Sequence, residues 1–182
     1  AFSGCYELTG VILPDSVTTL GYGIFNGCSK LTSINIPVSL TTCDYTTSSS
    51  APTYRGPFYG SSIATVAIPN DVTAIPNYTF AGCSALVNVE IPDKITSIGQ
   101  YAFAYASGIK TIVIPASTIS IGYSAFQNCT GLTSLTLNEG LVTINSCAFG
   151  GCSGLKTDSV APTVVKMHSG TFHNRAALTT VS

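Results

Sequence analysis

The stretch IFNGCSKLTSINIP, residues 24–37, returns later in the chain as TFAGCSALVNVEIP, residues 79–92, and as AFQNCTGLTSLTLN, residues 125–138. The aligned phenylalanines recur at one constant spacing, except between Phe25 and Phe80, where a degenerate unit is centred on Phe58. The full column is Phe2, Phe25, Phe58, Phe80, Phe103, Phe126, Phe149 and Phe172. A fixed period of about 20 to 29 residues is typical of a solenoid with leucine-rich-repeat geometry. Retained residues are expected to point inward and stack on their own copies.

Each unit also carries aliphatic residues spaced as L-x-x-L-x-L, for example Ile109, Ile112 and Ile114. The last positions alternate, which predicts a strand with every second side chain in the core. A proline such as Pro115 follows each strand and is expected to end it, because proline donates no ladder hydrogen bond. Successive strands are expected to pair into one long parallel sheet.

A second aliphatic pair in each unit, such as Ile95 and Ile98, predicts an opposite wall of the core. The sequence therefore predicts a single solenoid domain over residues 1–182, dominated by β-structure with short helical or 3-10 turns. About eight coils of about 23 residues are expected, one of them with an insertion of about ten residues that forms a loop over about 43–57.

Two further columns are rich in glycine and asparagine, the residues that best tolerate positive φ. Left-handed backbone is predicted at both columns, with Tyr105 as a strained exception in the first. The first column, two residues after each phenylalanine, is Gly4, Gly27, Gly60, Gly82, Tyr105, Asn128, Gly151 and Asn174. The second, nineteen residues after, is Gly21, Asp44, Gly99, Gly122, Asn145 and His168.

The phrase I-P-x-x-V-T-x-I-G-x-x-A-F-x-G-C-S-x-L-T-S resembles the BspA-like leucine-rich repeat, a subtype found on the surfaces of bacteria and parasitic protists. Residues 14–34, 69–89, 92–112 and 115–135 carry it, and weaker copies cover nearly all of the rest. The asparagine column of ordinary leucine-rich repeats is absent. The resemblance implies an extracellular or cell-surface module for adhesion or binding, without enzymatic activity in its repeats.

The composition agrees with an uncharged extracellular surface. Only 8% of the 182 residues are charged and the net charge is -1, against roughly 25% charged residues in a typical soluble domain. The low charge gives no electrostatic reason to expect binding to nucleic acid or to an anionic membrane. A membrane span is not predicted either, because the sequence has no run of about 18 apolar residues. The chain begins at Ala1 without a methionine or signal peptide, so a processed or excerpted product is expected.

The reactive residue types do not form a pattern that predicts an enzyme, a metal site or a cofactor site. Five of the seven cysteines, Cys5, Cys28, Cys83, Cys129 and Cys152, lie three residues after phenylalanine, where other units place Ser61 or Ala106. Such replacements predict a small buried slot filled by free thiols, with bridges between adjacent coils as the alternative. The two histidines, His168 and His173, lack an orienting acid in sequence, and the carboxylates are scattered.

Binding is predicted at two places, the outward side of the long sheet and the insertion. The outward side is a nearly uncharged hydroxyl surface that suits a protein or glycan ligand, although threonine also simply favours exposed strands. The insertion adds tyrosine and arginine, which are common interface anchors, although a neutral insertion is also tolerated cheaply. The candidates are Thr32, Ser33, Asn35, Asn88, Glu90, Lys110, Thr133 and Thr136 on the sheet, and Tyr45, Tyr54 and Arg55 in the insertion.

Two sequons, at Asn77 and Asn128, are possible glycosylation sites if the protein is secreted through a eukaryotic pathway. Neither end of the chain shows the polar capping unit that solenoids normally need, so head-to-tail self-association through uncapped ends is a second expectation. Two functions follow: a non-enzymatic extracellular module for adhesion or macromolecular binding, and alternatively a structural subunit that stacks end to end into an extracellular filament.

Overall fold

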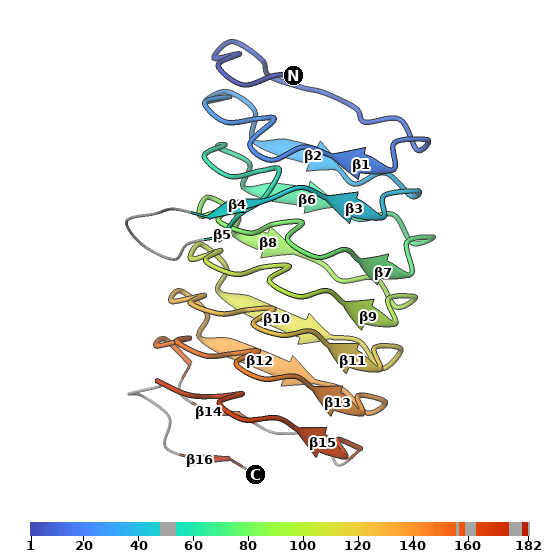
Figure 1. The fold of residues 1–182 in the computed structure, drawn as a ribbon, viewed down its shortest axis with the longest axis vertical. Helices are drawn as coiled ribbons and strands as arrows, with labels where there is room; N and C mark the ends of the chain where they lie inside the picture. Colours follow the sequence, from blue (N-terminus) through green and yellow to red (C-terminus); the bar gives the residue numbers. More distant parts are fainter. Residues whose placement is uncertain (48–53, 156, 159–162, 175–179, 182) are drawn as a thin grey trace.

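The computed structural model describes residues 1–47, 54–155, 157–158, 163–174 and 180–181. The chain winds into a stack of coils, with the N-terminus at one end of the long axis and the C-terminus at the other (Figure 1). Apart from the hairpin strands β4 (Thr46–Thr47) and β5 (Tyr54–Arg55), the strands fall into two columns that run along this axis, and each column forms one wall of the solenoid. The leucine-rich-repeat solenoid predicted from the sequence is therefore confirmed.

The first wall is built from the L-x-x-L-x-L motifs. Its strands are parallel, and they are not one continuous sheet, so that expectation was wrong: β8 pairs with β6 and ends at Val89 without pairing to β10. The expected proline stop is present, since β10 ends at Ile114, directly before Pro115. The wall consists of β2 (Ser33–Asn35), β6 (Thr65–Ala67) and β8 (Asn88–Val89), then β10 (Thr111–Ile114) and β12 (Ser134–Leu137), then β14 (Thr157–Asp158) and β16 (Thr180–Val181).

The second wall holds the longest continuous ladder. Five two-residue strands pair in parallel, with Ile75, Ile98, Ile121 and Ile144 in register. They are β7 (Ala74–Ile75), β9 (Ser97–Ile98), β11 (Ser120–Ile121), β13 (Thr143–Ile144) and β15 (Lys166–Met167), and β1 (Thr19–Leu20) pairs separately with β3 (Thr42–Cys43).

The phenylalanines form one stack through the core. Phe80, Phe103 and Phe126 are fully buried or nearly so, and adjacent ring centroids are 5.0 Å apart. The stack extends from Phe2 to Phe172 without a gap, with centroid distances of 5.0 to 5.7 Å and interplanar angles of 1° to 21°. Offset aromatic stacking at these distances contributes about 0.5–1.5 kcal/mol per pair beyond burial. Identical positions in successive coils therefore touch, as the repeat predicts.

The expected count of eight coils was slightly too high, because each phenylalanine marks a corner between two coils and not one complete coil. Eight corners enclose seven intervals, and the insertion lengthens the one from Phe25 to Phe58, which leaves about six regular turns of the solenoid.

The expected short helices are also absent from the described part of the chain, where the corners consist of short hydrogen-bonded turns of the backbone. Two left-handed residues, such as Tyr101 and Tyr105, bracket most of these corners and stop helical hydrogen bonding from continuing.

Left-handed backbone occurs in one of the two predicted columns. All eight residues that follow a phenylalanine by two positions have positive φ, including Tyr105 at 61°. The second column, with Gly99 and Gly122, does not have positive φ. At Gly122 the glycine is needed for space, since a Cβ on it would lie 2.6 Å from the amide nitrogen of Gln100 in the preceding coil. The second left-handed position falls two residues later, at residues such as Tyr101 and Ser124.

Four of the five column cysteines are buried thiols, as predicted, and Cys5 is the exception because it is exposed. The Cys129 thiol donates to the carbonyl oxygen of Phe103 at 3.1 Å, and the Cys152 thiol donates in the same way to Phe126. Cys28 repeats this contact with Phe2. At these three corners the thiol therefore ties the corner to the coil before it.

Burial makes the cysteines sensitive to alkaline conditions. Desolvation raises the pKa of the Cys43 thiol from 9.0 to about 11, partly opposed by its hydrogen bond to Thr79. The unfolded chain therefore loses this proton more readily, so the contribution to stability is complete below pH 9 and is lost as the pH rises towards 11. We expect the free energy of unfolding to fall across this window by up to about 1.4 kcal/mol per pH unit for this thiol. Urea unfolding at successive pH values should show a steeper fall for the natural chain than for Cys43→Ala, and equal slopes would contradict the assignment.

Candidate functional site

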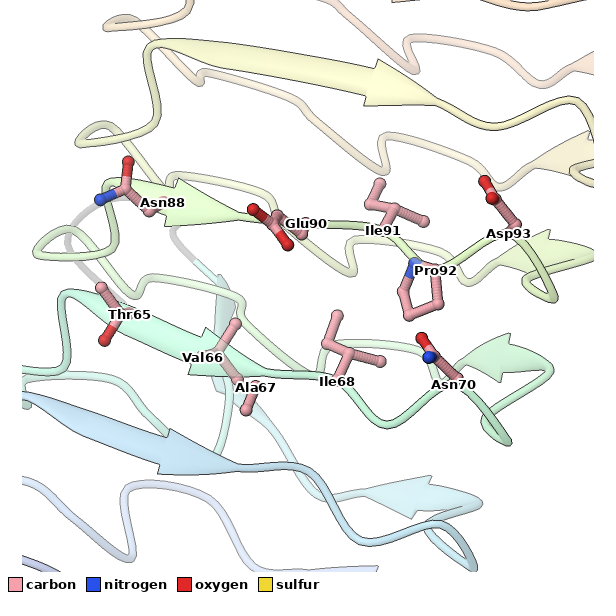
Figure 2. A pocket seen from close by; sticks show the side chains of 10 residues that line it. All are labelled: Thr65, Val66, Ala67, Ile68, Asn70, Asn88, Glu90, Ile91, Pro92 and Asp93. Atoms are coloured by element: carbon pink, nitrogen blue, oxygen red, sulfur yellow. The ribbon is translucent and has the colours of Figure 1, made fainter.

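A groove follows the first wall across several coils. Three adjoining hollows, with volumes of about 840, 540 and 310 Å³, share residues with one another over β2, β6, β8 and β10. The middle hollow lies between β6 and β8, and Figure 2 shows Ile91 and Pro92 alongside Ile68 and Asn70 of the preceding coil. We call this feature the sheet-face groove. Its residues include Ser33, Asn35, Thr65, Val66, Ala67, Ile68, Asn70, Asn88, Glu90, Ile91, Asp93, Thr111 and Val113.

The groove coincides with the end of the β8 ladder. Val66, Ile68, Val89 and Ile91 pack against the core but are only partly buried, whereas the equivalent Ile112 and Ile114 in β10 are fully covered. Because β8 does not pair with β10, the segment around Glu90 borders two hollows, one on each side. The result is an open surface with an aliphatic floor and polar edges, which is the usual composition of a ligand-binding surface.

The charges at the groove are carboxylates. Glu90 and Asp93 line it and are exposed, and neither forms an ion pair with any residue that the structure describes. Lys94, next to Asp93, instead contacts Asp71 at 2.7 Å, and the hydrogen bond from that lysine lowers the pKa of the Asp71 carboxyl. These two carboxylates are therefore available as hydrogen-bond acceptors.

The sheet candidates from the sequence divide into two groups. Ser33, Asn35, Asn88 and Glu90 line the groove. The others do not border it, and at one of them the hydroxyl is already used, since Thr133 donates to the carbonyl oxygen of Lys110 at 3.2 Å. These other candidates are Thr32, Lys110, Thr133 and Thr136, all exposed.

Asn35 has a structural role in addition to its place in the groove. Its side-chain oxygen accepts from the Leu13 amide at 2.9 Å, and its NH₂ group donates to the Leu13 carbonyl at 2.8 Å. Within the described chain, no strand of the first coil pairs with β2, so the asparagine side chain takes the place of a ladder there.

Replacing Asn35 should therefore destabilise the first coil. We expect Asn35→Ala to lower the free energy of unfolding by about 1–3 kcal/mol, because both polar groups of Leu13 lose their partner. Chemical denaturation would measure this loss against Ser33→Ala, an exposed change in the same strand for which less than about 0.5 kcal/mol is expected. Equal effects of the two variants would argue against the bridging role.

The insertion contains a hairpin that packs on the solenoid. β4 (Thr46–Thr47) pairs antiparallel with β5 (Tyr54–Arg55), while residues 48–53 of the expected loop lie outside the described residues. Tyr45 stacks on Tyr78 with ring centroids 3.7 Å apart, and Tyr54 lies 3.8 Å from Tyr101. Tyr123 meets the edge of Tyr101 at 5.4 Å, which completes a cluster of five rings that we call the tyrosine cluster.

Part of the predicted insertion site is thus committed to packing. Tyr54 is half-buried, and the guanidinium of Arg55 lies 4.5 Å from the ring centre of Tyr59. Burial raises the pKa of Tyr78 and of Tyr101 above the usual tyrosine value, with neighbouring tyrosine hydroxyls adding to the rise. Tyr45 remains 47% exposed and is the insertion candidate best placed to meet a ligand.

Sequence reasoning missed Tyr78 and Tyr101, which hold the hairpin in place. A signal was present, since the two tyrosines are one repeat apart and each precedes its phenylalanine by two positions. Their backbones have φ of 61° and 53°, which is rare for bulky residues and clusters at sites of binding or packing constraint.

A separate hollow lies where the hairpin leaves the second wall. It has a volume of about 480 Å³, and Asn77 belongs to its lining. Asn77 is exposed, and its side-chain oxygen accepts from the Gln100 amide at 2.8 Å. We call this hollow the corner pocket, formed by Thr41, Thr42, Cys43, Asp44, Tyr45, Asn77 and Tyr78.

The remaining titratable residues do not form a reactive arrangement in the described part of the chain. No three His, Cys, Asp or Glu side chains gather there in a way that could hold a metal ion. Nδ1 of His173 contacts the Gly170 carbonyl at 2.8 Å, and His168 is exposed. Among the described residues, no helix is long and apolar enough to cross a membrane.

Comparison with known proteins gives the repeat type. A family model described as a BspA-type leucine-rich repeat region, in six copies, matches residues 1–50 and 53–179. A leucine-rich cell surface protein from Faecalibacterium prausnitzii is similar in structure, with a TM-score of 0.69 and 26% identity over 91% of this chain. The T. pallidum leucine-rich repeat protein has a TM-score of 0.62 at 23% identity, over 84% of this chain and 72% of its own length, which shows the shared fold.

The chain spans 42% of the length of the F. prausnitzii protein. No curated protein sequence matches it.

Proposed function

The chain belongs to the BspA-type leucine-rich repeat family, and we propose that it is a non-enzymatic, cell-surface module that binds a macromolecule through its sheet-face groove. The cell-surface location is supported by the name of the similar F. prausnitzii protein. Binding through a wall of stacked strands suits a solenoid, because successive coils present one extended surface.

The observation that carries the proposal is the row of three adjoining hollows on the first wall. Together they cross β2, β6, β8 and β10, so a ligand would contact side chains from several coils at once. Partly buried Val66 and Ile91 supply apolar contact, and exposed Asn88 and Glu90 supply polar contact. This mixture suits either a protein segment or a glycan, and both are members of the proposed ligand class.

The test is binding of the purified chain to arrays of extracellular proteins and of glycans, compared with a variant that blocks the groove. Ala67 is exposed and lines two of the hollows, so Ala67→Arg places a long side chain in the groove. Thr73→Arg makes the same change of charge at an exposed position next to the second wall.

We expect array ligands to be lost by Ala67→Arg and kept by Thr73→Arg. Ligands that survive Ala67→Arg, or an absence of any ligand, would refute binding at the groove. The end-to-end filament stays a prediction, and sedimentation of the same sample at rising concentration would check it.

A further inference from the structure

We propose that the corner pocket is a second binding site, specific for a neutral pyranose such as the terminal sugar of a glycan. It lies beside the hairpin rather than on the sheet-face groove, and it exists because of the insertion. Asp44 and Tyr45 belong to the inserted coil, whereas Asn77 and Tyr78 belong to the next corner. The regular coils carry no hairpin, so this combination occurs once in the described chain.

The aromatic part of the site is a fixed tyrosine ring. Tyr45 stacks against Tyr78 at 3.7 Å with an interplanar angle of 10°, yet it remains 47% exposed. Tyr78 is in turn held by its stack on Tyr101 at 5.4 Å. The face of an aromatic ring carries partial negative charge and attracts the slightly positive C–H groups on one side of a pyranose. A ring already fixed by packing loses little conformational entropy when the sugar binds.

The polar part of the site combines an acceptor and a donor. Asp44 is exposed and has no ion pair among the described residues, while its amide donates to the Leu20 carbonyl at 2.9 Å and fixes the backbone. The side-chain oxygen of Asn77 is used by Gln100, which leaves the Asn77 NH₂ to donate. A carboxylate and an amide NH₂ that line the same pocket match sugar hydroxyls, since each hydroxyl both donates and accepts.

Other small ligands match the pocket less well. Among the described residues that line it, none is a lysine or an arginine, so an anion would lack a counter-charge. A cation would use Asp44 and the Tyr45 ring but would leave the amide donor of Asn77 unsatisfied. A neutral sugar uses all three groups, and the volume of about 480 Å³ belongs to the usual range of small-molecule sites.

The experiment is saturation-transfer difference NMR with a panel of methyl pyranosides and, separately, choline chloride, on protein made in bacteria so that Asn77 carries no glycan. We expect at least one pyranoside to bind in the millimolar range. Tyr45→Ala should weaken it roughly three- to tenfold and Asp44→Asn about tenfold or more. Tyr22→Ala, at a tyrosine that is 57% exposed and outside the pocket, is the matched control and should leave binding unchanged.

Three results would overturn the proposal: no pyranoside binds, choline binds in place of the sugars, or Tyr22→Ala weakens binding as much as Tyr45→Ala. Thermal unfolding of each variant shows whether the fold is intact. If Tyr45→Ala loses its fold, Asp44→Asn decides the matter, because the Asp44 side chain is exposed. Ala67→Arg should not alter sugar binding, which separates this site from the groove.

Discussion

Phe103→Ala should lower the free energy of unfolding by about 3–5 kcal/mol, the usual cost of removing a buried phenylalanine. The ring is fully buried and stacks on two neighbours, Phe80 and Phe126, each at 5.0 Å, so its loss opens a cavity between two coils. Urea denaturation followed by circular dichroism would measure the change. Because the stability of a solenoid depends on contacts between neighbouring repeats, the transition should also become less cooperative.

The matched control is Phe2→Ala. This ring is partly buried and, among the described residues, stacks on Phe25 alone, at 5.3 Å, so its removal should cost clearly less. If the two variants were equally destabilised, the phenylalanine stack would not be the element that joins the coils.

Gly122→Ala should destabilise the protein by about 1–3 kcal/mol, in the range of other overpacked positions. The new Cβ would lie 2.6 Å from backbone atoms of both Gly99 and Gln100, and backbone cannot move aside as a flexible side chain would. The midpoint of thermal unfolding would report the loss.

Gly10→Ala is the comparison, since a Cβ there meets nothing within 4 Å. A neutral or slightly stabilising effect is expected, because alanine restricts the unfolded chain more than glycine does. A harmless Gly122→Ala would mean that the coils can separate at this corner without cost.

Most of the fold could be predicted because the same sequence pattern occurs in nearly every coil. The phenylalanine stack, the proline after β10 and the left-handed residue two positions after each phenylalanine all follow from residues that recur at a nearly fixed interval. The prediction of positive φ at Gly122 was wrong, because a glycine column looks the same in sequence whether it serves positive φ or a close approach of backbone.

What the sequence could not predict depends on contacts that do not repeat. The interruption between β8 and β10 that borders the groove has no marker in the motif. Tyr45 and Tyr54 were identified as candidates, but their stacking on Tyr78 and Tyr101 depends on how the hairpin folds back over the next coils. A repeat period in the sequence predicts contacts between equivalent positions of successive coils. The corner pocket is instead lined by residues at positions that are not equivalent in the repeat.

The hairpin also has a consequence for what this scaffold tolerates. Although the chain between Phe25 and Phe58 is longer than a regular repeat, their rings still stack at 5.7 Å, so the extra length leaves the core unchanged. That corner is therefore a natural insertion point at which an engineer could graft a foreign peptide or epitope and display it from a rigid support.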